Sequence, residues 1–154
     1  MRTCSAITLV LTALLLGTTF AHTLEALPKL DYGQEMWVVL QQTLYRYYAV
    51  IGGPVELGAI LSASILAFLV RGQRMPFLAA AAGTACLAVA FFGVWLLVTR
   101  DVNAQVLAWP ADSIPADWAD LRLKWEASHI ARFVLHLTGF VLLLVAALRV
   151  RRRG

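Results

Sequence analysis

Charged side chains are scarce in this sequence. Only 14% of its 154 residues are Asp, Glu, Lys or Arg, and 60% are hydrophobic. Soluble domains usually carry about 25% charged residues. The uncharged stretches approach the roughly 20 residues that cross a bilayer as a helix. This composition excludes a soluble globular protein and predicts membrane-spanning helices.

Cysteine is also scarce. Cys4 and Cys86 are too few for a disulfide framework or a cysteine-based zinc site, and we interpret both as small packing residues. The chain contains no glycine-rich phosphate loop and no nucleic-acid-binding motif. Its net charge of +4 does not indicate nucleic acid, because the basic residues cluster at the ends of the hydrophobic runs.

The hydrophobic runs predict an all-α protein, a bundle of four transmembrane helices that forms one integral membrane domain over residues 1–154. We place the spans at about 5–26, 47–70, 75–98 and 129–149, with an extension of the last helix over about 115–128. The two long connections, 27–46 and 99–129, are expected to form a lid over one end of the bundle.

The first hydrophobic run also resembles a cleavable signal peptide, with small residues at Thr19 and Ala21. We favour a retained span because His22 and Glu25 follow at helical spacing, and because retention gives an even number of spans. Cleavage after Ala21 stays an alternative.

The charges are distributed unevenly. Seven basic residues and no acidic ones fall at the termini and in the short turn between the second and third spans: Arg2, Arg71, Arg74, Arg149, Arg151, Arg152 and Arg153. All nine acidic residues fall on the other side, as do all Trp and Tyr residues. By the positive-inside rule both termini are expected in the cytoplasm, in a cell (inner) membrane. The aromatic residues predict a pocket on the outer side, with an interfacial belt as the alternative.

Polar side chains concentrate along the last predicted helix. At helical spacing they share a stripe about 120° wide, which consists of Trp118, Arg122, Trp125, Glu126, His129, Arg132 and His136. Ionisable groups inside a membrane are costly unless they are paired, so Glu56, Arg132 and His136 are functional candidates. The alternative is a structural ion pair of Arg132 with Glu56 or Glu25.

A metal site is one hypothesis for these residues. The candidate ligands are His22, Glu25, Glu56, Glu126 and His129. A di-iron bundle needs a Glu-x-x-His motif on each of two helices, whereas here the His22–Glu25 spacing is reversed and the third span offers no carboxylate or histidine. A single metal ion stays an alternative, and bis-histidine haem is a weaker one. We expect no resident cofactor.

Acid–base chemistry fits the residue types better. A histidine with a carboxylate one turn away is a suitable proton acceptor, and this role falls to His22 or His129. Glu25 or Glu126 would orient the imidazole. Arginine stabilises a developing oxyanion, a role for Arg122 or Arg132.

One pattern in the chain is familiar. It reads Asn103…Pro115-Ala-Asp-Trp118…Leu121-Arg122…Trp125-Glu126…His129…Arg132, after a span ending His22…Glu25 and another carrying Glu56. It resembles the anthrone-oxygenase-like family of small four-helix membrane proteins, most of which are known only as a domain of unknown function. The resemblance covers most of the chain. It implies an oxygenase that converts anthrones to anthraquinones without a cofactor, and functional roles for His22, Glu25, Glu56, Asn103, Trp118, Arg122, Trp125, His129 and Arg132.

We therefore predict an oxygenase or oxidoreductase in the bilayer that acts on an apolar aromatic or quinone-like substrate. The catalytic candidates are His22, Glu25, His129, Arg132 and Arg122, and the substrate-binding candidates are Glu56, Trp95, Asn103, Trp118, Trp125 and His136. The alternative is a non-enzymatic membrane protein, a ligand binder or accessory subunit whose polar cluster is a structural ion-pair network. The sequence does not indicate an oligomeric state.

Overall fold

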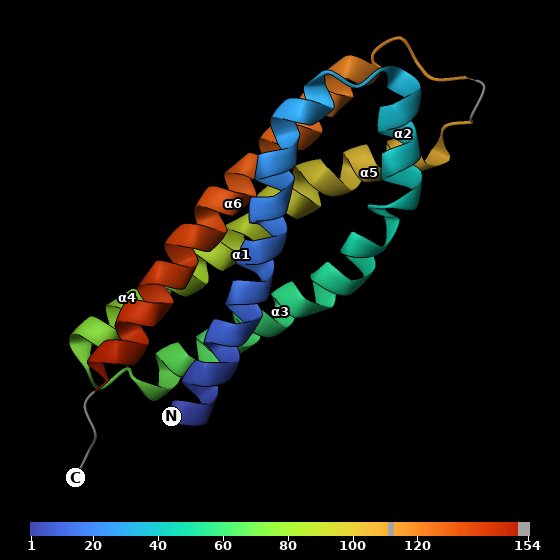
Figure 1. Ribbon diagram of the computed structural model, residues 1–154. Helices are drawn as coiled ribbons and strands as arrows, with labels where there is room; N and C mark the ends of the chain where they lie inside the picture. Colours follow the sequence, from blue (N-terminus) through green and yellow to red (C-terminus); the bar gives the residue numbers. More distant parts are fainter. Residues whose placement is uncertain (111–112, 151–154) are drawn as a thin grey trace.

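The computed structural model describes residues 1–110 and 113–150, and these are helical almost throughout (Figure 1). The elements in chain order are α1 (Arg2–Leu30), α2 (Gln34–Thr43), α3 (Arg46–Leu69), α4 (Arg74–Ala88), the π-helical segment η1 (Val89–Thr99), α5 (Arg100–Ala108) and α6 (Trp118–Arg149). Four helical stretches are long and apolar enough to cross a membrane: α1, α3, the continuous stretch Arg74–Ala108, and α6. The predicted all-α four-helix bundle is confirmed.

The third long helix continues past the predicted end of its span. It runs through η1 and α5 to Ala108, so much of the expected loop 99–129 is helical. The hydropathy pattern stops at Arg100 and Asp101 because these side chains are charged, but charge does not end a helix. The last helix begins at Trp118, and α2 occupies the middle of the first connection. Three of the seven basic residues used to predict the orientation lie outside the described residues: Arg151, Arg152 and Arg153.

Small residues let the helices pack closely. The apolar core of the bundle consists of Leu15, Ala59, Ala63, Leu66, Ala67, Val70, Ala80, Leu87, Leu143 and Ala146. Gly83 and Gly139 mark the closest approach of α4 and α6. A Cβ atom at Gly83 would lie 2.9 Å from the Leu143 Cγ and 3.0 Å from the Gly139 carbonyl oxygen. Small residues at contacts between transmembrane helices serve the same purpose.

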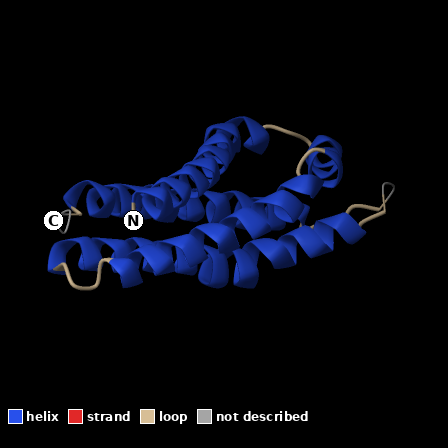
Figure 2. Cartoon of the chain, turned by 90° about the horizontal axis from the view of Figure 1, so that it is seen from below, coloured by secondary structure: helices blue, strands red, loops and turns tan. Residues whose placement is uncertain are grey.

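Both ends of the described chain lie at one end of the bundle (Figures 1 and 2). We call the opposite end, formed by α2, α5 and the first turns of α6, the lid end. There Trp37 and Val38 of α2 pack against Val102, Val106 and Trp125. The Gln42 side-chain amide also donates hydrogen bonds to the Val106 and Trp109 carbonyl oxygens, at 3.0 and 3.1 Å. The helix α2 is therefore fixed over this end.

The outer surface of the bundle is apolar. Large side chains such as Leu14, Ile51, Leu61, Phe68 and Val134 are all more than half exposed. A helix with satisfied backbone hydrogen bonds and an apolar outer face is suited to a hydrocarbon environment. The chain is a multi-pass membrane protein, and the lipid bilayer is its solvent.

Candidate functional site

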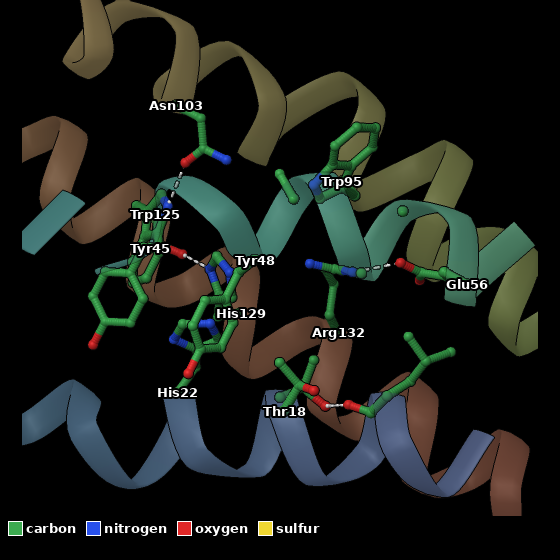
Figure 3. Close-up of a pocket in the computed structure, with 15 residues that line it drawn as sticks. Thr18, His22, Tyr45, Tyr48, Glu56, Trp95, Asn103, Trp125, His129 and Arg132 are labelled. Carbon is green, nitrogen blue, oxygen red and sulfur yellow. Dashed lines mark hydrogen bonds and ion pairs between the residues drawn. The ribbon is translucent and has the colours of Figure 1, made fainter. Parts of the chain in front are cut away.

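A cavity of about 60 Å³ lies inside the bundle next to the lid end, with walls from all four long helices (Figure 3). Candidates from the sequence that line it are His22, Glu56, Trp95, Asn103, Trp125, His129 and Arg132. Tyr45, Tyr48, Thr18 and Gly52 line it as well. Residues separated by more than a hundred positions thus meet in one place. The site residues predicted from the sequence therefore make up nearly half of the residues that line this cavity.

Two histidines form the centre of the site. The ring centroids of His22 and His129 are 4.4 Å apart, and the Trp125 ring lies 3.9 Å from His129. The Nδ1 atom of His129 is 3.0 Å from the Trp125 carbonyl oxygen. A carbonyl oxygen only accepts hydrogen bonds, so this contact assigns the proton of the neutral His129 ring to Nδ1. Its Nε2 atom then carries a lone pair that can accept a proton.

His22 is enclosed by other rings. Besides His129, its ring lies 4.9 Å from Tyr45, 5.3 Å from Tyr48 and 5.2 Å from Trp125. Its Nδ1 atom is 3.8 Å from the Glu25 carboxylate and makes no hydrogen bond within the described residues. Glu25 therefore lies near His22, as the spacing predicted, but does not hold it by a direct hydrogen bond.

Glu25 has shorter contacts elsewhere. The Tyr45 hydroxyl donates to its Oε2 at 2.5 Å, and the Lys29 ammonium lies 3.1 Å from the same oxygen. Burial, and secondly the hydrogen bond to Glu25, raise the pKa of the Tyr45 phenol far above its ordinary value. Tyr45 consequently stays a neutral hydrogen-bond donor at physiological pH. The Glu25 side chain is 44% exposed, so the hydrogen-bonded set of Tyr45, Glu25 and Lys29 reaches the protein surface at Glu25.

Lys29 is a buried residue of this region that sequence reasoning missed. It is 2% exposed, lies 3.8 Å from the Glu126 carboxylate, and sits over the rings of Tyr45 and Trp125 at 4.5 and 4.8 Å. It falls within the predicted connection 27–46, where the sequence gives no reason to expect burial. Its position four residues after Glu25, typical of an ion pair on a helix, was the available signal. Glu126 faces Lys29 and does not line the cavity.

A second polar cluster lies deeper in the bundle. An Arg132 Nη atom is 2.6 Å from Glu56 Oε2, and His136 Nε2 is 2.9 Å from Glu56 Oε1. The other ring nitrogen of His136 lies 3.3 Å from the Thr19 hydroxyl. These contacts connect α1, α3 and α6. They confirm the predicted ion pair in its Glu56–Arg132 form, whereas Glu25 pairs with Lys29 instead.

Four of the predicted site residues do not line the cavity: Glu25 and His136 lie in the polar groups beside it, and Arg122 and Trp118 lie at the lid end. Arg122 donates to the carbonyl oxygens of Lys29 and Tyr32, at 3.1 and 2.8 Å, and its guanidinium stacks on the Trp118 ring at 4.5 Å. A cation that bonds one carbonyl in the last turn of α1 and another just after it stabilises the end of that helix. Trp118 packs against Trp37, 6.3 Å away. In this structure Arg122 and Trp118 organise the lid end.

Asn103 and Trp95 line the cavity from the third long helix. The Asn103 side-chain oxygen accepts a hydrogen bond from the Trp125 indole N–H at 2.8 Å, which fixes the indole beside His129. Trp95 stacks on Phe91 with ring centroids 5.1 Å apart. The extension of this helix to Ala108 is what brings Asn103 to the site.

The carboxylates among the candidate metal ligands fall into two groups with different partners. Glu25 and Glu126 face Lys29, whereas Glu56 faces Arg132 and His136. Within residues 1–110 and 113–150, no group of three or more His, Cys, Asp or Glu side chains converges as ligands of one ion. Comparison of the chain with protein families, with curated proteins and with solved structures found no match.

Proposed function

We propose that this protein is an anthrone-oxygenase-like membrane enzyme, an oxygenase or oxidoreductase acting on an apolar aromatic or quinone-like substrate. The supporting observation is the buried histidine pair. His129 presents Nε2 as a proton acceptor in a cavity bordered by aromatic rings. We further propose that the protein lies in the inner membrane with both termini in the cytoplasm, which the basic residues at that end favour.

The reaction begins at a weakly acidic C–H group of the substrate, which in an anthrone lies between the two aromatic rings of the molecule. His129 takes its proton, and the negative charge moves onto the substrate oxygen, where Arg132 stabilises it. Dioxygen then accepts the electrons. One of its atoms becomes the new carbonyl oxygen and the other leaves as water, so the reaction balances without a resident cofactor.

The test is oxygen consumption and quinone absorbance with an anthrone, using protein in mild detergent. His129→Gln is expected to lower turnover by about 10²–10⁴-fold, the usual contribution of a positioned general base. Lys124→Gln, an exposed change on the same helix, serves as the matched control and is expected to turn over normally. A folded His129→Gln protein with wild-type turnover would overturn the proposal.

The alternative function is that of a non-enzymatic ligand-binding or accessory protein. The hydrogen-bonded Glu56, Arg132 and His136 favour it, because they link three helices as a structural network does. In that case the wild type consumes no oxygen, and substitutions in the network unfold the bundle. Metal analysis separates a third outcome: near-stoichiometric iron or copper in the purified protein would indicate a metal-dependent oxidoreductase.

A further inference from the structure

A second, larger hollow lies between α1 and α3, on the side of the bundle that faces lipid. It has a volume of about 340 Å³, and its own walls are apolar, with Leu14, Leu44, Tyr47, Ile51 and Val55. Leu14, Tyr47 and Ile51 are each more than half exposed, so the hollow opens on the outer surface. We call it the α1–α3 groove.

The groove shares a wall with the polar cavity. Leu15, Thr18, Tyr48 and Gly52 line both of them. From this wall, Tyr48 also packs on the His22 ring at 5.3 Å. Figure 3 shows Thr18 on α1 in the same view as His22, Tyr48 and Arg132. A molecule in the groove is therefore next to the histidine pair.

Two residues of the shared wall, Gly52 on α3 and Thr18 on α1, are small. A Cβ atom at Gly52 would meet no atom within 4 Å. On the other helix, the Thr18 hydroxyl donates to the Leu14 carbonyl of its own helix at 2.8 Å. Because Gly52 has no side chain and the Thr18 hydroxyl bonds to its own helix, there is room between α1 and α3 beside these two residues.

We propose that the α1–α3 groove binds the long apolar chain of an amphiphilic ligand, whose polar head occupies the cavity beside His129 and Arg132. A cavity of about 60 Å³ accommodates only the reacting part of an organic ligand, because pockets for whole organic ligands usually measure about 300–1,000 Å³. The groove lies directly across the shared wall from the cavity and has the missing volume. This inference rests on the proposed function only in treating the cavity as a ligand site.

The head group must provide most of the selectivity. Moving an alkyl chain from lipid into an apolar groove exchanges one apolar environment for another, so it gives little hydrophobic driving force. The hydrogen bonds of the head in the cavity are the part that lipid cannot replace. The ligand class is thus a long-chain molecule with one compact hydrogen-bonding head, such as a phenol or quinone.

The experiment uses a long-chain phenol with a photoreactive diazirine midway along its alkyl chain, added to the full-length protein in nanodiscs. We expect the crosslinks, mapped by mass spectrometry, to fall within residues 14–18 and 44–55. Gly52→Phe fills the shared wall and is expected to reduce this labelling at least tenfold. Gly17→Phe is the matched control, because Gly17 also has open space, lies on α1, and lines neither hollow.

Thr18→Phe, which closes the same wall from α1, provides a second test if Gly52→Phe does not fold. Equal labelling by a diazirine alkane without the phenol head, or unchanged labelling in folded variants of the shared wall, would overturn the proposal. Labelling of the groove without any turnover of anthrone supports the groove and counts against the oxygenase. Turnover of anthrone without labelling of the groove supports the oxygenase and counts against the groove.

Discussion

The two buried polar clusters are built differently. In the deep cluster, Glu56 receives short contacts from Arg132 and His136, at 2.6 and 2.9 Å. Around the histidine pair, the short contacts of 2.5 and 3.1 Å belong to Glu25 alone, with Tyr45 and Lys29. His22 lies 3.8 Å from Glu25, and Glu126 lies 3.8 Å from Lys29, distances longer than hydrogen bonds. Both clusters lie in the same bundle and involve the same helix, α6.

This difference separates structure from function. Where no water is present, short contacts between charged and hydrogen-bonding groups fix the helices that contribute them. A loosely paired cluster keeps polar atoms that a ligand can use, at some cost in stability. We infer that the deep cluster holds α1, α3 and α6 together, that its Arg132 also faces the cavity, and that the histidine pair is the part of the site that accepts the proton.

The largest expected effect comes from Glu56→Ala. This substitution leaves Arg132 buried without its partner, and removing one member of a buried ion pair costs about 3–5 kcal/mol. We expect that loss in the free energy of unfolding, measured by denaturant titration in detergent with helical circular dichroism. Ser64→Ala, an exposed change on α3, should stay within about 0.5 kcal/mol. A loss below 1 kcal/mol for Glu56→Ala would contradict a structural role for the deep cluster.

The same substitution at two histidines tests the comparison directly. His136→Ala removes a 2.9 Å contact to Glu56, and an unsatisfied buried group costs about 1–3 kcal/mol. His129→Ala removes a contact to a carbonyl oxygen that is already bonded within its helix, so we expect a smaller loss. In turnover or probe binding the order should be reversed, with the greater effect at His129. Equal effects of the two changes on both measurements would abolish the distinction between the clusters.

Hydropathy and charge were sufficient to predict the four helices, and together with the family resemblance they identified nearly half of the residues that line the cavity. Uncharged runs identify spans, and the helical period of α6 places Trp125, His129 and Arg132 on one face. Glu56 was recognised because a carboxylate inside an apolar run needs a partner. The sequence left Arg132 as a partner of either Glu56 or Glu25, and the structure pairs it with Glu56.

The remaining features depend on how helices pack, which one sequence does not reveal. Lys29 and Tyr45 were assigned to a connection, yet the length of α1 buries the first and the position of α2 brings in the second. Arg122 matched the expected stripe, but its side chain turns to the end of α1. The α1–α3 groove could not be predicted, because an opening depends on the spacing of two helices and on the one small residue, Gly52, between them.

The smallest expected effect involves Tyr45, which connects the exposed Glu25 to the buried rings around His22. Its phenol has a raised pKa in the folded protein, so the folded state retains the proton more strongly than the unfolded state, whose tyrosines titrate near pH 10. The contribution of Tyr45 to stability is therefore complete below about pH 10 and declines as the pH rises above it, by up to about 1.4 kcal/mol per pH unit.

Tyr45→Phe separates this effect from those of the other tyrosines. Near neutral pH the variant should lose about 0.5–1.5 kcal/mol of unfolding free energy, the usual net value of one hydrogen bond. Between pH 10 and 11 the difference between the two proteins should shrink, because only the wild type loses the contribution of Tyr45. Tyr32→Phe, near the exposed end of α1, is the control for removal of a tyrosine hydroxyl outside the buried site. If the difference in unfolding free energy between wild type and Tyr45→Phe stays constant across this range, Tyr45 is as accessible to water as an ordinary tyrosine. In that case Tyr45 does not belong to the buried part of the site.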